Sequence, residues 1–285
     1  MIGPGDFLQQ RARRNIVRWV EGLFNDQAQG ERPVVRSDDA LFAPSSVIWR
    51  VHGDVTTMMI GGVSALLLQM LHPAVLAGVW DHSGFRKDMV GRLRRTARFV
   101  STTTYADRAA AAAAIARVRD IHSRIAGTLP DGTPYRADDP DLLGWVHLTE
   151  AWSFLAAWRR FGDRRLSAAE ENAYLTDFAT IGQALGASAI PGDAAGTEIA
   201  LDRYRSRLAV DNRTREVARL VLGHMPDNPL AIPLQRVTMQ AAVDLLPAWA
   251  RRMHGLPASP SLARPIVSTG AFGLATTLRW AFAER

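Results

Sequence analysis

Apolar and polar positions alternate along this chain at the period of an α-helix almost throughout, with apolar residues three and four positions apart. Residues that favour helix N-termini mark several helix starts. They include Ser45 or Ser46 before a helix near residue 47 and the capping box Ser167-Ala168-Ala169-Glu170. Asp139-Pro140 is another favourable start. The predicted helices cover residues 7–24, 47 onward, 85–100, 106–126, 140–161, 167 onward, 197–209, 213–224, 230–253 and 262–282.

Alternation with period two, which is typical of strands, is absent except for a short predicted hairpin over residues 127–136. There Asp131-Gly132 is a turn signal. The fold class predicted from these patterns is all-α, a single irregular multi-helix bundle of at least eight helices. No Gly/Ser/Pro-rich linker divides the chain, so residues 1–285 are predicted to form one domain.

One apolar segment is long enough to cross a bilayer, which takes roughly 20 residues. Residues 55–80 contain no Asp, Glu, Lys or Arg over 26 positions. Gln69 and His72 interrupt the segment, and Pro73 should kink or restart the helix because proline has no backbone donor. Lipid supplies no partners for such polar groups, whereas neighbouring helices do. We therefore predict a buried core helix here rather than a membrane span, the rival interpretation being a membrane-associated scaffold.

Composition excludes several classes of function. The chain has no cysteine, which rules out disulfides, thiolate metal sites and cysteine nucleophiles. The net charge of +6 comes from basic residues spread over the whole chain, and all 34 of these except Lys87 are arginines. A nucleic-acid surface normally shows a local basic cluster, so no nucleic-acid partner is expected, and membrane contact is at most peripheral. The arginines near the amino terminus are not followed by the apolar segment of a signal peptide, which favours a cytoplasmic protein.

His122 is the most informative histidine. It continues an apolar helix face formed by Ile115, Val118 and Ile125, while Arg117, Asp120 and Arg124 point away from that face. An inward histidine is either a core residue bonded to a carbonyl group or a ligand of a metal or haem iron. The pattern alone leaves both interpretations open.

A second candidate is the basic helix over residues 85–100, where Asp88, Arg92, Arg95 and Thr96 share one face. This face could be solvated and carry an Asp88–Arg92 pair, or it could form the polar wall of a site for an anionic cofactor.

His147 and Glu150 lie one helical turn apart and could bind iron without haem. A di-iron bundle would need a second such pair, which the sequence lacks. The signatures of a serine hydrolase and of a phosphate-binding loop are also missing.

Several motifs, taken in order, resemble the family of MpaB and the latex-clearing protein, a rubber oxygenase. They are Gly53-Asp54, the segment Leu67-Leu68-Gln69-Met70-Leu71-His72-Pro73-Ala74-Val75, then Gly78-Val79-Trp80-Asp81-His82-Ser83, Asp88, and Arg92-Leu93-Arg94-Arg95-Thr96. The similarity continues through residues 117–122, 135–147 and 245–255, so it covers most of the chain.

The resemblance implies a helical domain enclosing a buried pocket for haem b, with oxidation of an apolar small-molecule substrate, isoprenoid or lipid-like, by O2 or peroxide. By position, His122 would ligate the iron, and Arg92 and Thr96 would lie at the haem pocket. Arg95 stands where the rubber oxygenase has a lysine that can cap the iron. Arginine stays protonated, so this difference argues against rubber-type gating.

The remaining assignments follow from the same resemblance. Arg92 and Arg95 could pair with haem propionates or polarise bound oxygen, and Asp88 is the candidate for proton handling. His72, His82 and His147 are further candidates for the wall of the haem site or for a second iron ligand. An electron donor would be an additional partner, and the oligomeric state stays open, a homo-oligomer included. The rival functions are a haem carrier or sensor without turnover and a non-haem iron oxygenase using His147 and Glu150.

Overall fold

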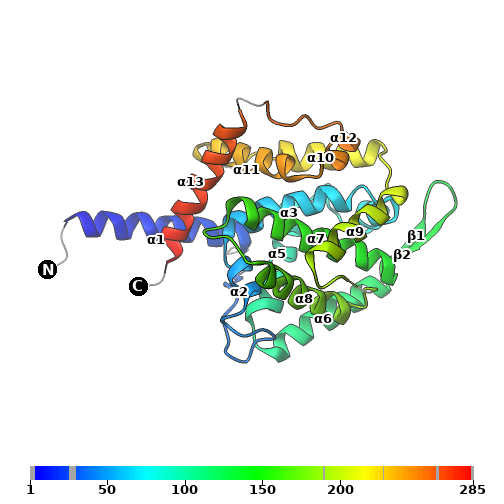
Figure 1. Cartoon of the computed structure of the whole chain (residues 1–285), viewed down its shortest axis with the longest axis horizontal. Helices are drawn as coiled ribbons and strands as arrows, with labels where there is room; N and C mark the ends of the chain where they lie inside the picture. The colour runs from blue at the N-terminus through cyan, green and yellow to red at the C-terminus, as the bar shows by residue number, and fades with distance from the viewer. Residues whose placement is uncertain (1–3, 26–29, 189, 227, 261–262, 284–285) are drawn as a thin grey trace.

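The computed structural model describes residues 4–25, 30–188, 190–226, 228–260 and 263–283, and these residues are mainly helical (Figure 1). The helices are α1 (Pro4–Phe24), α2 (Val47–His52), α3 (Val55–Gln69), α4 (Pro73–His82), α5 (Met89–Tyr105), α6 (Arg108–Ser123), α7 (Pro140–Phe161), α8 (Ala168–Leu185), α9 (Ala194–Tyr204), α10 (Asn212–Gly223), α11 (Ile232–Leu245), α12 (Ala248–His254) and α13 (Arg264–Phe282). Two short 3-10 segments are η2 (Arg205–Arg207) and η3 (Pro229–Ala231). The prediction of an all-α fold with at least eight helices is confirmed.

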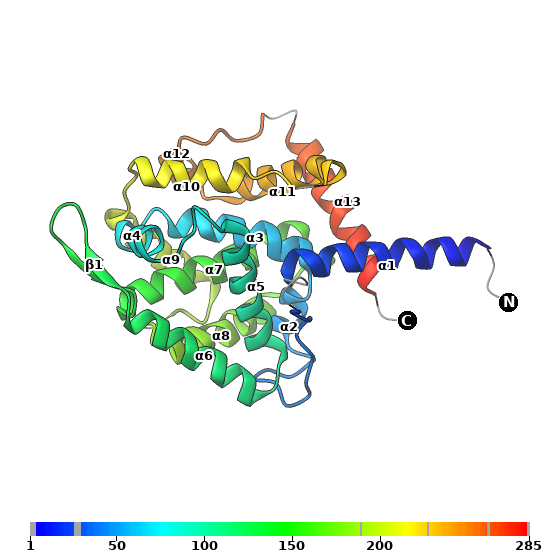
Figure 2. The same ribbon diagram turned by 180° about the vertical axis from the view of Figure 1, so that it is seen from behind.

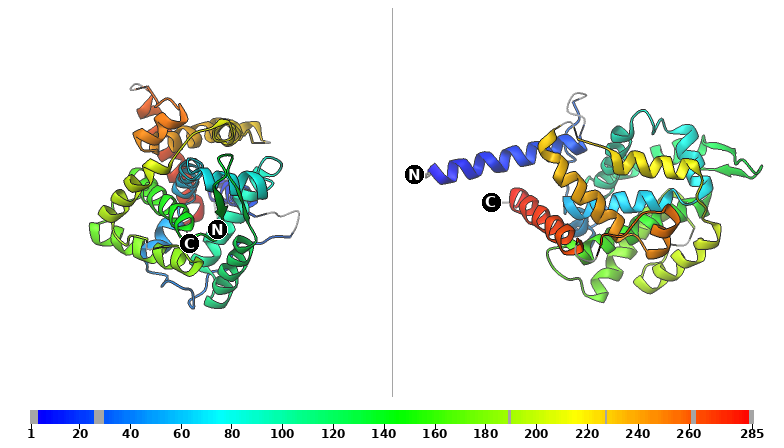
Figure 3. Two further views of the ribbon diagram at one scale, coloured as in Figure 1. Left: turned by 90° about the vertical axis from the view of Figure 1, so that its right-hand side faces the viewer. Right: turned by 90° about the horizontal axis from the view of Figure 1, so that it is seen from above.

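The helices pack in layers above and below a central pair, α3 and α7 (Figures 1 and 2). Helices α10, α11 and α12 lie on one side of this pair, and α2, α6 and α8 lie on the other (Figure 1). Helix α1 extends away from the body (Figure 3) and packs against α13, which crosses it in the view of Figure 1. The strands β1 (Ala126–Thr128) and β2 (Pro134–Arg136) form the small antiparallel hairpin predicted from Asp131-Gly132, at the end of the molecule opposite α1.

The uncharged segment is two helices and not one. Helix α3 ends at Gln69, and α4 begins at Pro73 in a direction that differs by 105°. Pro73 occupies the first turn of α4, where its missing donor costs no hydrogen bond. The predicted restart at this proline is therefore confirmed. Among the described helices, none is by itself long and apolar enough to cross a membrane, and α3 with α4 reaches that length only as this bent pair.

Close packing of α3 against α7 depends on a glycine. A Cβ atom added to Gly61 would lie 2.8 Å from Cδ1 and 3.0 Å from Cα of Phe154, so only glycine permits this approach. Around it, Ile60, Leu67 and Trp145 are fully enclosed. This seam forms part of the larger hydrophobic core, which also includes residues of α4, α9, α10, α11, α12 and α13. A second cluster fills the space between α2, α7 and α8.

Three predicted helices were wrong by four residues or more at one end, or are broken in two. The basic helix begins at Met89 instead of residue 85, because Gly84 turns the chain with φ +57° and Asp88 caps the helix. The segment predicted over 230–253 is broken near Pro247 into α11 and α12. The segment predicted over 197–209 starts earlier, as α9, and passes after Tyr204 into η2.

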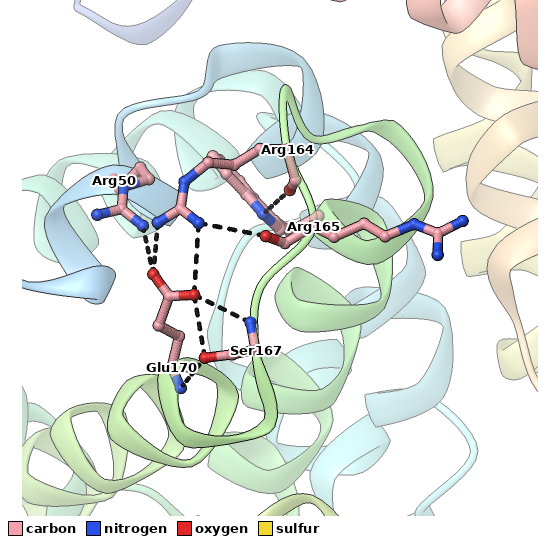
Figure 4. Close-up of polar contacts among 6 residues, drawn as sticks. Arg50, Arg164, Arg165, Ser167 and Glu170 are labelled. Carbon is pink, nitrogen blue, oxygen red and sulfur yellow. Dashed lines mark hydrogen bonds and ion pairs between the residues drawn. The ribbon is translucent and has the colours of Figure 1, made fainter.

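The predicted capping box of α8 is confirmed, and it also links helices. Ser167 Oγ accepts from the backbone N–H of Glu170, and the Glu170 carboxylate accepts from the backbone N–H of Ser167. The same carboxylate pairs with Arg164 and, at 3.0 Å, with Arg50 from α2 (Figure 4). These two guanidinium groups and the cap hydrogen bonds hold the pKa of Glu170 well below its usual range.

Candidate functional site

Helices α5 and α6 are joined by only two residues, Ala106 and Asp107, and their burial is uneven. In α5 the buried residues all lie in the second half, from Val100 onward, and in α6 they are Ala111 and Ile115, in the first half. The halves remote from the connection, residues 89–99 of α5 and 116–123 of α6, contain no fully buried side chain among the described residues. We call these two halves the open end of the α5–α6 pair. Arg92, Thr96 and His122 lie there.

His122 has the predicted orientation. Ile115 is buried, Val118, His122 and Ile125 are half-buried, and the neighbouring Arg117, Asp120 and Arg124 are exposed. Val118 packs with Ile115 in the second hydrophobic cluster. The inward direction of His122, inferred from spacings of three and four, is therefore confirmed.

The His122 ring is neutral and has no hydrogen-bond partner. Its Nδ1 atom is buried without a partner, and neither ring nitrogen forms a hydrogen bond to any residue that the structure describes. Burial lowers the pKa of His122, and the nearby charge of Arg92 lowers it further. A neutral imidazole with a free ring nitrogen is the form that binds iron.

His52 shows how an ordinary buried histidine differs. Its Nδ1 atom lies 2.8 Å from Thr104 Oγ1, and its Nε2 atom lies 3.4 Å from the Tyr174 hydroxyl. Both ring nitrogens are thus satisfied within the protein, as is usual for buried polar groups. This cluster of His52, Thr104 and Tyr174 was not predicted, because its members come from three separate helices.

Arg92 is a half-buried cation without a counter-ion. Its guanidinium carbon lies 6.0 Å from the centre of the Phe85 ring. No carboxylate in the described part of the chain forms an ion pair with Arg92. Burial lowers its pKa to about 10, with a further contribution from Arg95, so the group is still charged at neutral pH. An unpaired, partly desolvated arginine favours an anionic ligand, since guanidinium groups bind carboxylates in two-point contacts.

The predicted pair between Asp88 and Arg92 was wrong. Asp88 accepts from the backbone N–H of Gly91 at 2.8 Å and pairs with Arg95 Nη1 at 3.1 Å. Asp88 is the N-cap residue and lies outside the helical geometry, so the i,i+4 rule does not apply to it. The Gly91 N–H and Arg95 lower the pKa of this exposed carboxyl, which keeps it ionised.

Thr96 lies one turn after Arg92 on the same side of α5. Its side chain is exposed, and its hydroxyl donates to the Arg92 carbonyl oxygen at 3.2 Å. The structure therefore brings Arg92, Thr96 and His122 to one end of the α5–α6 pair. Asp88 and Arg95 lie on the solvent-exposed side of the same end.

His147 is fully enclosed on α7, where it packs against Phe178 with ring centres 5.7 Å apart. Its Nδ1 atom has no partner, and burial lowers its pKa to about 4, with a smaller contribution from His122. No hydrogen bond or ring contact joins His147 to His122 among the described residues, so the place of His147 in a cofactor site stays a prediction.

Glu150 faces α3 instead. Gln69 Nε2 donates to Glu150 Oε1 and to the Val146 carbonyl oxygen, at 3.4 Å in each case. Burial raises the pKa of Glu150 to about 7. No group of three or more His, Cys, Asp or Glu side chains suited to a metal occurs among the described residues, so His147 and Glu150 lack a third protein ligand for non-haem iron.

The two remaining candidate histidines, His72 and His82, have other surroundings. His72 is the buried N-cap residue of α4, and its ring lies 6.5 Å from that of Trp145. His82 is exposed, and its Nε2 atom lies 3.3 Å from the hydroxyl of Tyr135 in the hairpin. No described contact joins either histidine to Arg92 or His122, so their place in a cofactor site stays a prediction.

Comparison with known proteins gives one match. The family model described as "ER-bound oxygenase mpaB/B'/Rubber oxygenase, catalytic domain" matches residues 49–280. No curated protein and no solved structure shows a significant match to the chain. The matched segment contains every residue of the candidate site.

Proposed function

Because the chain belongs to the family of MpaB-type and rubber oxygenases, we propose that it is a haem b-dependent oxygenase that oxidises an apolar small molecule with O2 or peroxide. One observation carries the haem assignment. Within the described residues His122, whose pKa is lowered by burial, has no hydrogen-bond partner, and Arg92, half-buried at the same open end, has no counter-ion. Haem b combines an iron that binds neutral imidazole with carboxylates that bind guanidinium, so these two residues fit it.

The apolar surroundings fit the same group. Leu93 and Phe99 on α5 and Val118 on α6 are only half-buried, although each packs against a hydrophobic cluster. A flat apolar ring placed at the open end would cover these side chains and remove them from water. The protein would then hold the group between an apolar wall and two polar residues.

Each site residue has a role that follows from its state. His122 would hold the iron through its free ring nitrogen, and Arg92 would bind a carboxylate of the cofactor or polarise oxygen. Haem supplies the oxygen chemistry when bound. Thr96 keeps the Arg92 carbonyl oxygen satisfied and can reorient its hydroxyl toward a ligand. Asp88 caps α5 and pairs with Arg95, which leaves its predicted role in proton handling without support from its position.

The decisive measurement is the visible spectrum of the protein purified after expression with added haem. We expect a Soret band in the wild type and its loss in His122→Ala. His224→Ala is the matched control, because His224 follows α10, outside the candidate site. A His122→Ala variant that keeps a normal haem spectrum would show that another residue holds the iron.

A second measurement separates an enzyme from a carrier or sensor. Haem-loaded protein is incubated with reductant, O2 and an isoprenoid or fatty substrate, and products are identified by mass spectrometry. Oxygenated product supports turnover. A stable spectrum without product would leave haem binding intact and reject the oxygenase function for the substrates tested.

A further inference from the structure

The outer face of α13 is apolar and uncharged although it is exposed. Ile266, Phe272 and Trp280 have 72%, 51% and 42% of their surface exposed. At about 100° per residue these three side chains lie within roughly 120° of one another around the helix. Thr269, Gly273 and Thr276 separate them without adding charge. Arg279, the only charged residue of α13 beyond its first, turns inward to Asp54 at 2.5 Å and to the Phe161 carbonyl oxygen at 2.6 Å.

Helix α1 places arginines beside this face. It extends away from the rest of the protein and crosses the carboxy-terminal end of α13 (Figures 1 and 3). Arg13 contacts that end directly, because its Nε donates to the Ala281 carbonyl oxygen at 3.3 Å and its guanidinium carbon lies 5.6 Å from the Trp280 ring centre. Between residues 9 and 20, α1 has four arginines and no acid.

The crossing also forms a hollow of about 490 Å³. Its lining residues are Gln10, Arg13, Arg14, Val17, Arg18 and Ala281. Three arginine side chains line this hollow, but most of its lining is apolar, so the hollow can take an apolar group next to positive charge.

We propose that α1 and the outer face of α13 together dock on the surface of a bilayer that contains anionic phospholipids. Exposed Phe and Trp side chains would enter the boundary between headgroups and acyl chains, and the α1 arginines would bind lipid phosphates. The charge of the α1 arginines argues against a second copy of the chain as the partner of this face. A symmetric dimer through this face would bring the same arginines of both copies together, whereas anionic headgroups neutralise them.

The test is co-sedimentation of the full chain with vesicles of phosphatidylcholine, alone or mixed with phosphatidylglycerol. We expect binding to the anionic vesicles that weakens as salt increases. Replacing Arg11, Arg14 and Arg18 with glutamine should weaken it roughly a hundredfold. The double change Phe272→Ser and Trp280→Ser should weaken it roughly tenfold or more, in salt-independent fashion.

Matched controls use exposed residues elsewhere. Ile199→Ser on α9 removes a side chain that is 55% exposed, and glutamine at Arg117, Arg203 and Arg219 removes three exposed arginines from α6, α9 and α10. The affinity of these control variants for anionic vesicles should fall only by the small amount that their change in net charge requires. This loss should be well below the loss in the α1 triple variant. Circular dichroism confirms that each variant is folded.

Three results would overturn the proposal. The first is absence of binding to anionic vesicles, and the second is binding that the α1 and α13 variants reduce no more than the controls do. The third is a wild-type dimer, seen by light scattering, that Phe272→Ser with Trp280→Ser converts to monomer, because this would identify a second copy as the occupant. None of these measurements depends on haem, so they test the membrane surface independently of the proposed oxygenase function.

Discussion

The α3–α7 seam and the open end of the α5–α6 pair are both made by neighbouring helices, but only the seam is complete. In the seam, Leu67, Leu68 and Trp145 have no exposed surface, and Gly61 allows the helices to approach closely. At the open end Leu93 is only half-buried, Arg92 has no counter-ion, and both ring nitrogens of His122 lack partners within the described residues. The contrast fits the proposed function, in which the seam provides stability and the open end would hold the ligand.

The largest effect is expected in the seam. Leu67→Ala removes a fully enclosed side chain, so the free energy of unfolding should fall by about 2–5 kcal/mol. The matching change on α5 is Leu93→Ala. In haem-free protein it should lower the free energy of unfolding by less than half as much, because Leu93 is only partly covered. Denaturation with urea measures both values. Equal losses would mean that the open end is packed as tightly as the seam.

Arg92 provides the next test, now of the open end. Arg92→Gln should weaken haem binding by about 1.5–3 kcal/mol, roughly tenfold to a hundredfold, because a charge-assisted contact is lost. Arg92→Lys keeps the charge and should recover part of the affinity. Titration of haem-free protein with haem gives the dissociation constants. Unchanged affinity in Arg92→Gln would remove Arg92 from the cofactor site.

Glu150 is an acidic group that faces α3 at the seam, and it makes stability depend on pH. Burial raises its pKa from the ordinary value of 4.5 to about 7, so the folded state holds a proton that the unfolded state releases. The stabilisation is complete below pH 4.5 and is lost as the pH rises through 7. Glu150→Gln should therefore be more stable than the wild type at pH 8, by about 1–3 kcal/mol, and this advantage should vanish near pH 4.5.

Thermal unfolding of the wild type and of Glu150→Gln across this range measures the difference. His147 has the opposite tendency, since its pKa is lowered to about 4 and its neutral form is lost as the pH falls. His147 is present in both proteins, so its effect on stability cancels when they are compared. A difference that does not change with pH would show that folding leaves the pKa of Glu150 unchanged.

Features that depend on neighbours along the chain could be predicted from the sequence. The helical class, the cap at Ser167 with Glu170, the restart at Pro73 and the inward face of His122 each follow from spacing or from backbone chemistry over a few residues. Such features need no knowledge of which helices meet.

Features that depend on tertiary contacts could not be predicted in the same way. His82 contacts Tyr135 in the hairpin, and Gln69 donates to Glu150 across the seam. In both pairs the partners lie far apart in the sequence. The partner of Asp88 was missed for a local reason. A cap residue does not have helical backbone angles, so its side chain does not follow the i,i+4 spacing of the helix. Arg92 and Arg95 of α5 differ in burial and pairing, and the sequence alone did not separate them.

The smallest effect is therefore expected at Arg95. Its side chain is 62% exposed and already paired with Asp88, and such surface pairs contribute little. Arg95→Gln should change haem affinity by less than about threefold, against the much larger loss in Arg92→Gln, in the same titration. A loss equal to that of Arg92→Gln would mean that Arg95 leaves Asp88 and turns toward the haem when it binds. The open end would then rearrange around its ligand, whereas the seam would stay fixed.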